Sequence, residues 1–128
     1  ARRGADPRPE MRAALADCDA ALALADDPAQ RANRGGAWAK LAEAEAARGG
    51  DPRPAQAAAE ADLRGALERG FVRAHLELGL LYGAMGRWED AIAAFEAGAK
   101  ALPGYAEWTR TCIEQTRKRQ AAAQSKGD

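Results

Sequence analysis

Side chains suited to catalysis or metal binding are few in this sequence. His75 is the only histidine, Ser125 is the only serine, and the two cysteines are Cys18 and Cys112. A Ser-His-Asp triad needs a serine within reach of its base, and the sequence offers no such pairing. Two widely spaced cysteines supply neither a zinc site nor a disulfide framework. We therefore expect a protein that is not an enzyme and that needs no cofactor or metal.

Charged residues are numerous but balanced. Lys and Arg together number 19, as do Asp and Glu, so the formal net charge is zero. The acidic residues are scattered at spacings typical of solvated helix faces, and no apolar stretch approaches the length of a membrane span. The one basic concentration lies near the C-terminal end, at Arg117, Lys118, Arg119 and Lys126. It lacks interleaved aromatic residues, so a nucleic-acid accessory module is kept only as an alternative function.

The composition favours closely packed helices. Hydrophobic residues make up 47% of the chain but aromatic residues only 5%, because alanine supplies much of the apolar content. Alanine is the best helix former and buries little side chain. Apolar and small residues recur at three- and four-residue spacing, which predicts six helices at 10–25, 30–48, 54–69, 73–85, 88–101 and 105–120. Residues 1–9 are expected to be irregular and residues 121–128 to form a flexible tail.

Glycines mark several predicted helix ends. Gly70 and Gly86 are expected to end the third and fourth helices, because glycine adopts the left-handed backbone conformation at no steric cost. Arg-Gly-Gly occurs at 34–36 and again at 48–50. We interpret both triplets as helix breakers, the first of which weakens the start of the second helix.

The stretch from 74 to 105 carries a more specific pattern. A leucine, small residues and aromatic residues recur in register before a proline, at Leu78, Gly79, Tyr82, Ala91, Phe95, Gly98 and Pro103. This pattern resembles the tetratricopeptide repeat, a helix-turn-helix unit of about 34 residues. His75 departs from it, since a large apolar residue is usual at that place. The Sel1-like repeats are a weaker alternative, suggested by residues 67–86.

An internal repeat supports this resemblance. The tetrapeptide DPRP occurs at 6–9 and at 51–54. Superposing the two copies aligns Ala14 with Ala59, Asp17 with Asp62, Cys18 with Leu63 and Ala21 with Ala66. The predicted helices 10–25 and 54–69 are then equivalent second helices, and the first of them lacks a preceding partner. Because the sequence also begins at Ala1 and not at methionine, we expect the C-terminal part of a longer array, with 105–120 as its capping helix.

The resemblance implies an all-α fold, a right-handed superhelical solenoid of antiparallel helix pairs. Its first helices would line a concave groove, at Arg73, Leu76, Leu80, Ala84, Glu107, Arg110, Glu114 and Arg117. Some family members grip acidic chaperone tails with lysine and asparagine in such a groove, and Leu76 and Leu80 occupy those places here. The alternative for both leucines is simple packing against a neighbouring helix.

The function implied by the resemblance is protein–protein interaction, as an adaptor or as a scaffold subunit of a larger assembly. The partner would be a protein or peptide. It would contribute an extended or helical segment that carries an apolar anchor and an acidic group, and the acidic group would pair with Arg73 or Arg110. Nucleic acid is not the expected partner. The cysteine usage favours the cytoplasm or another reducing compartment.

Overall fold

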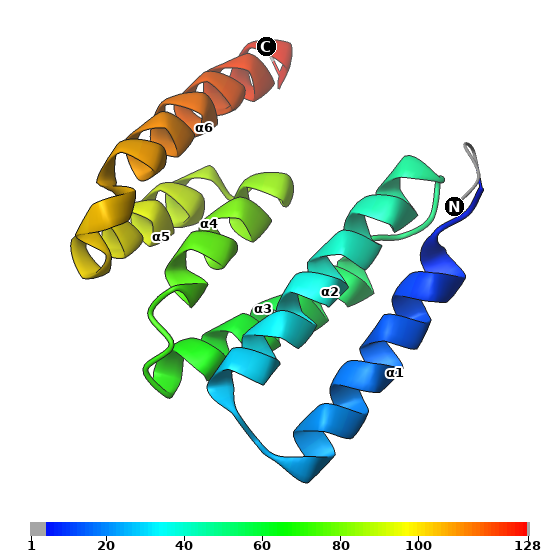
Figure 1. Cartoon of the computed structure of the whole chain (residues 1–128). Coiled ribbons are helices and arrows are strands. Elements are labelled where there is room, and N and C mark those ends of the chain that lie inside the picture. The colour runs from blue at the N-terminus through cyan, green and yellow to red at the C-terminus, as the bar shows by residue number, and fades with distance from the viewer. Residues whose placement is uncertain (1–4, 128) are drawn as a thin grey trace. The chain divides into compact units, whose positions relative to one another are not determined.

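Six α-helices account for most of the chain (Figure 1). The computed structural model describes residues 5–127, and no strand occurs among them. The helices are α1 (Arg8–Leu24), α2 (Pro28–Ala47), α3 (Arg53–Glu68), α4 (Ala74–Ala84), α5 (Trp88–Ala101) and α6 (Ala106–Gly127), and a short 3-10 turn η1 (Pro103–Tyr105) precedes α6. The all-α class and the six predicted helices are therefore confirmed.

The helix boundaries differ from the predicted ones mainly at the two ends of the chain. Helix α1 already begins at Arg8, so only residues 5–7 of the predicted irregular segment are non-helical, and residues 1–4 lie outside the described residues. Helix α6 continues to Gly127, although a flexible tail was expected after residue 120. Three successive alanines at 121–123 favour this continuation, because alanine has the highest helix propensity.

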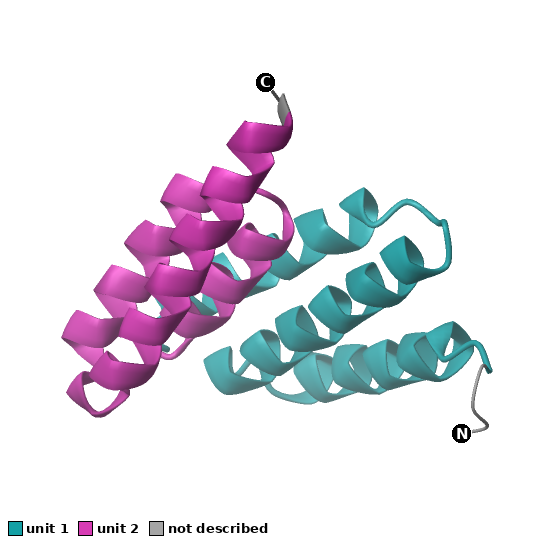
Figure 2. Cartoon of the chain, turned by 90° about the horizontal axis from the view of Figure 1, so that it is seen from above, with its two compact units in different colours: residues 1–71 teal, residues 72–128 magenta. Residues whose placement is uncertain are grey.

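The chain separates into two compact units, residues 1–71 and residues 72–128 (Figure 2). In the first unit, α2 packs against both α1 and α3. In the second unit, α4 and α5 form an antiparallel hairpin, and α6 packs against α5. Each unit thus consists of successive helices that pack on their neighbours in the sequence. The right-handed superhelical arrangement of the whole chain stays a prediction.

The two DPRP copies form the same structure at the start of α1 and of α3. Asp6 Oδ1 accepts hydrogen bonds from the backbone N–H and from Nε of Arg8, both at 2.9 Å. Asp51 Oδ1 accepts the same two groups of Arg53, at 3.0 and 2.9 Å. Each aspartate thereby satisfies an N–H that has no partner inside its helix. The sequence repeat is therefore also a structural repeat of the helix start.

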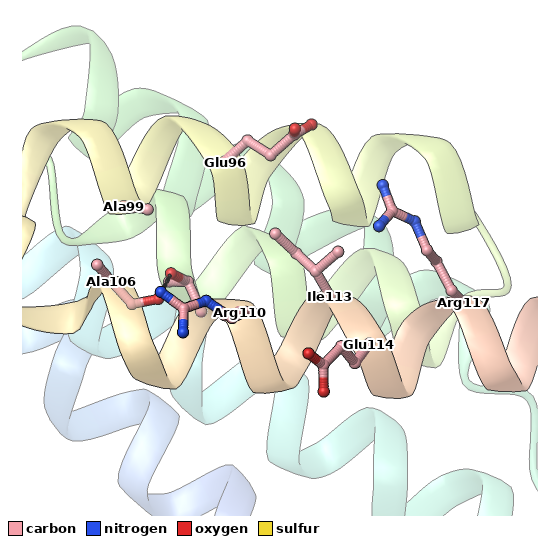
Figure 3. A pocket seen from close by; sticks show the side chains of 8 residues that line it. Glu96, Ala99, Ala106, Arg110, Ile113, Glu114 and Arg117 are labelled. Atoms are coloured by element: carbon pink, nitrogen blue, oxygen red, sulfur yellow. Dashed lines mark hydrogen bonds between the residues drawn. The ribbon is translucent and has the colours of Figure 1, made fainter.

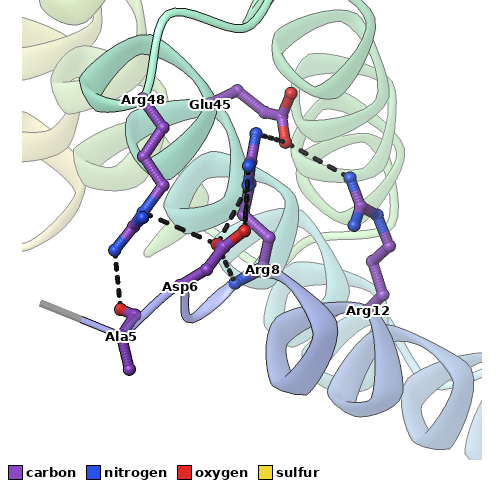
Figure 4. Close-up of polar contacts among 6 residues, drawn as sticks. All are labelled: Ala5, Asp6, Arg8, Arg12, Glu45 and Arg48. Carbon is purple, nitrogen blue, oxygen red and sulfur yellow. Dashed lines mark hydrogen bonds and ion pairs between the residues drawn. The ribbon is translucent and has the colours of Figure 1, made fainter. Parts of the chain in front are cut away.

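Arginines join the start of α1 to the end of α2 (Figure 4). Glu45 accepts hydrogen bonds from Arg8 at 3.3 Å and from Arg12 at 3.2 Å. Arg48 lies 3.5 Å from Asp6 and donates to the carbonyl of Ala5 at 2.6 Å. Arg8 and Arg12 of α1 provide a physical reason for a carboxylate at position 45.

Asp6 is expected to titrate at unusually low pH. Its pKa falls from 3.8 to about 2, first because the Arg8 side chain donates to it and then because the Arg8 backbone N–H does. The folded pKa is below the unfolded one, so the stabilisation is complete above about pH 4 and is lost as the pH falls toward 2. An NMR titration should show a carboxyl midpoint near the lower value, and Asp6→Asn should remove this part of the acid sensitivity. A titration midpoint near the ordinary value of 3.8 would contradict the contact between Asp6 and Arg8.

The first Arg-Gly-Gly triplet does not break a helix. Gly35 is buried inside α2, where an added Cβ would lie 2.9 Å from Leu63 Cγ and 3.2 Å from Asp62 Cβ. The glycine therefore allows α2 and α3 to approach closely, which corrects the predicted breaker role. The second triplet does end a helix, because α2 stops at Ala47 and Gly49 has a φ of 78°.

The neighbouring Gly36 offers a matched test of this close approach. A Cβ at Gly36 would meet nothing within 4 Å. Both Gly→Ala changes gain up to about 1 kcal/mol of helix propensity. Only Gly35→Ala also forces Leu63 to move, and such overpacking costs about 1–3 kcal/mol. In urea unfolding, the Gly36→Ala protein should therefore have the higher free energy of unfolding, by about the 1–3 kcal/mol that overpacking costs Gly35→Ala. Equal free energies of unfolding would disprove the close approach.

Small residues also allow close packing of α4 on α5. A Cβ at Gly79 would lie 2.6 Å from the ring of Phe95, and one at Gly98 would lie 2.5 Å from Leu76 Cδ2. Phe95 is 1% exposed, and its ring meets that of Trp108 edge-on at a centroid distance of 5.9 Å. Gly79, Phe95 and Gly98 of this packing are among the seven positions that carry the tetratricopeptide resemblance, whereas Leu76 and Trp108 are not.

Candidate functional site

The candidate site is an open pocket between α5 and α6 (Figure 3). Its volume is about 460 Å³. The lining side chains come from two turns of α5 and from one stripe of α6, namely Glu96, Ala99, Ala106, Thr109, Arg110, Ile113, Glu114 and Arg117. Residues three, four and seven apart share a helix face, so the continuous helix α6 brings its six members to one side.

The floor of the pocket is mostly apolar. Ala99 and Ile113 are half-buried, and Figure 3 shows Ile113 extending from α6 toward α5. Thr109 is 1% exposed, and its hydroxyl donates to the carbonyl of Ala106 at 2.9 Å. Its hydrogen-bond donor is therefore already used inside the helix. This floor can contact an apolar side chain but offers few directed polar contacts.

The rim of the pocket is charged. Arg110 and Arg117 are exposed, and neither forms an ion pair with another residue of the described range 5–127. They lie seven residues apart on α6, which corresponds to about 10 Å along a helix. Figure 3 shows Arg117 extending toward α5 and Glu114 pointing away from it. Two cationic groups thus flank the apolar floor, where they can bind a carboxylate.

The structure brings together three of the eight predicted groove residues. Arg110, Glu114 and Arg117 line the pocket, whereas Glu107 is exposed on α6 outside it. Leu80 and Ala84 are exposed on α4, and Arg73 is exposed just before that helix; none of the three contributes to the lining.

The expectation for Leu76 needs a correction. This side chain is 5% exposed and fills the space left by Gly98, so it belongs to the core and not to an accessible surface. By contrast, Leu80 is 54% exposed. Of the two interpretations left open for these leucines, packing holds for Leu76 and exposure for Leu80.

Sequence reasoning assigned no site role to the pocket residues from α5 or to the floor residues of α6. Glu96 and Ala99 lie on α5, which was treated as a packing helix only. Thr109 and Ile113 share the helical stripe of Arg110 and Arg117. Both residues lie at helical spacing from the predicted groove residues of α6, so the same spacing rule would have assigned Thr109 and Ile113 to the site. Nothing in the sequence alone indicated which face of α5 lies opposite them.

One residue of the basic C-terminal end is occupied by contacts within its own unit. The guanidinium of Arg119 lies 5.3 Å from the ring centre of Trp88, and it donates to the carbonyl of Gly83 at 3.2 Å. That carbonyl belongs to the last turn of α4, which interacts favourably with a cation. Arg119 therefore stabilises the hairpin and is less available to a polyanion than its position suggested.

The chemically reactive side chains have the environment of packing residues. Burial lowers the pKa of His75, so the imidazole is neutral near pH 7. Burial raises the pKa of the Cys112 thiol, and a thiol of raised pKa is a poor nucleophile. Within residues 5–127, no group of three or more His, Cys, Asp or Glu side chains could hold a metal ion.

Comparison with known proteins found no matching family model, curated protein or solved structure. The resemblance to the tetratricopeptide repeat therefore rests on the seven sequence positions alone. None of the helices in the described part of the chain has the length and apolar character needed to cross a bilayer.

Proposed function

We propose that this chain is a non-catalytic protein–protein interaction module, an adaptor or scaffold subunit of the tetratricopeptide type, that binds a partner segment in the α5–α6 pocket. The observation that carries the proposal is the pair Arg110 and Arg117, which have no ion-pair partner among residues 5–127 and lie beside an apolar floor. Cationic groups with no ion-pair partner in the described part of the chain, next to Ile113 and Thr109, are suited to an amphipathic ligand.

The pocket also defines the chemistry of the segment that would fit it. An apolar side chain would lie over Ile113 and Ala99, and a carboxylate would pair with Arg110 or Arg117. The volume is within the usual range of about 300–1,000 Å³ for small ligand sites. Glu96 and Glu114 also line the pocket and would repel a segment with many acidic residues. The preferred partner is therefore a short segment with one apolar anchor and one acidic residue, and not a polyacidic tail.

A selection from a random peptide library tests this proposal. Peptides recovered with the whole chain should combine an apolar residue with an acidic one. Their affinity should fall at least ten-fold, or by about 1.4 kcal/mol, for Arg110→Glu combined with Arg117→Glu. Circular dichroism should first show that the variant keeps its helical content, which is expected because both residues are exposed.

A matched control comes from the same helix. Lys118→Glu combined with Lys126→Glu makes the same change in net charge, but neither lysine lines the pocket. This control should bind the selected peptides as the parent chain does. Equal losses in both variants would mean that the binding depends on overall charge. Enrichment of polyacidic peptides would contradict the pocket as the site.

A further inference from the structure

We propose that the segment bound in the α5–α6 pocket also carries a basic residue, which pairs with Glu96 of α5. This inference rests on the proposed function and defines its partner more closely. The occupant is then a short zwitterionic segment. It carries an acidic residue for the arginines of α6, an apolar anchor for the floor, and a lysine or arginine for the carboxylate on the opposite helix.

The two helices that form the pocket present opposite charges to it. Arg110 and Arg117 line it from α6, whereas Glu96 is the charged lining residue that α5 contributes (Figure 3). Glu114 also lines the pocket from α6, but Figure 3 shows it pointing away from α5. A ligand that lies between the two helices therefore meets cations on one side and a carboxylate on the other.

Glu96 differs from an equivalent carboxylate on the same helix. Glu89 lies seven residues earlier in α5, so the two glutamates share one helix face. Glu89 accepts a hydrogen bond from Gln120 of α6 at 2.9 Å. Glu96, by contrast, is exposed and forms no ion pair or side-chain hydrogen bond with any residue of the range 5–127.

The sequence of α6 gives the physical reason for this difference. Ile113 precedes Gln120 by seven residues and therefore lies on the same face of α6. It lines the pocket together with Glu96, and its side chain has no hydrogen-bond donor. At Glu89 the chain supplies the donor itself, whereas at Glu96 it presents an apolar group. The donor for Glu96 is thus left to the ligand.

A bound segment would also change the hydration of Glu96. Covering the apolar floor removes water from the pocket, and a carboxylate that loses water without gaining a donor costs binding free energy. An ammonium or guanidinium group at this place replaces that cost with a charge-assisted hydrogen bond. Glu96 therefore selects against segments that carry only an apolar and an acidic residue.

The length of the pocket limits the spacing of the three groups. Arg110 and Arg117 lie about 10 Å apart along α6. An extended chain rises roughly 3.3 Å per residue, so about three residues span this length. The acidic, apolar and basic residues of the ligand should therefore fall within about four consecutive positions.

Peptides recovered from the random library with the whole chain are the probe for this inference. We expect each to carry a lysine or arginine within about three positions of its acidic residue. Replacing this base by glutamine should weaken binding to the parent chain about five-fold or more, as for an ion pair at the edge of an interface. Binding to the Glu96→Gln chain should change less than about two-fold, because the partner of the base is already absent there.

Glu114→Gln is the matched control, because it removes the same charge from another lining residue. In this variant the replacement of the base should still weaken binding about five-fold. A peptide with glutamate in place of the base should bind poorly to the parent chain and recover its affinity for the Glu96→Lys chain. Failure of this charge exchange, or a base that is coupled to Glu114 and not to Glu96, would overturn the inference.

The same peptides separate a failure of this inference from a failure of the proposed function. Peptides that need Arg110 and Arg117 but contain no basic residue would overturn the role of Glu96 and leave the proposed function standing. Peptides that bind equally well to the chain carrying Arg110→Glu and Arg117→Glu would remove the proposed function, and this inference with it.

Discussion

Phe95→Ala is expected to lower the free energy of unfolding of the second unit by about 3–5 kcal/mol. Phe95 is 1% exposed, and its ring fills the space between Gly79 of α4 and Trp108 of α6. Removing the ring takes apolar surface out of the core and leaves a cavity that a helical backbone cannot close. Native-state hydrogen exchange of the α4 and α5 amides should measure the loss, because it reports on the second unit separately.

Leu80→Ala provides the control for this prediction. Leu80 lies one residue from Gly79 but is 54% exposed. Its truncation should change the free energy of unfolding by less than about 1 kcal/mol, because an exposed side chain contributes little packing to the folded state. If Leu80→Ala proved as damaging as Phe95→Ala, the assignment of Phe95 as the centre of this core would be wrong.

Asp62→Ala is expected to cost about 2–3 kcal/mol, because it leaves the guanidinium of Arg34 partly buried without its bidentate partner. The Asp62 side chain is 7% exposed and that of Arg34 is 25% exposed. Hydrogen bonding to Asp62 is the main cause that raises the pKa of Arg34. Without this partner the guanidinium still stays charged, because the ordinary pKa of arginine lies far above neutral pH. The cost is below that of a fully buried pair, because Asp19 still accepts from Arg34 at 2.9 Å.

Asp17→Ala is the matched variant for Asp62→Ala, since the two aspartates hold equivalent places in the repeat. Asp17 is exposed, and its removal should alter the unfolding of the isolated chain by no more than about 0.5 kcal/mol. Urea unfolding of both variants measures the difference. Equal effects would contradict the difference in burial between Asp17 and Asp62.

The helices were predictable from the sequence because their causes are local. Apolar periodicity depends on residues within one or two turns, and glycine with positive φ at Gly70 and Gly86 ends α3 and α4 as expected. Aspartate before proline also predicts a helix start without reference to distant residues. Asp27 supports this, since its carboxylate accepts from the backbone N–H of Ala29 at 2.9 Å.

The site was only partly predictable, because it depends on which helix faces meet. Leu76 and Leu80 lie one turn apart, yet only Leu76 meets the gap at Gly98 and becomes buried. Gly35 looked like a helix breaker because its partner Leu63 is 28 residues away in the sequence. In both cases a glycine decides the packing through space that it leaves open for a distant side chain. The spacing of apolar residues within one helix does not indicate which distant side chain will fill such a space.

The most direct test of the proposed function is an NMR titration of the isotopically labelled whole chain with a peptide recovered from the library. The proposal predicts saturable shift changes at Ala99, Thr109 and Ile113, which line the pocket, and their loss in the chain carrying Arg110→Glu and Arg117→Glu. Shift changes that avoid these residues, or that persist in that variant, would contradict the assignment of the α5–α6 pocket as the binding site.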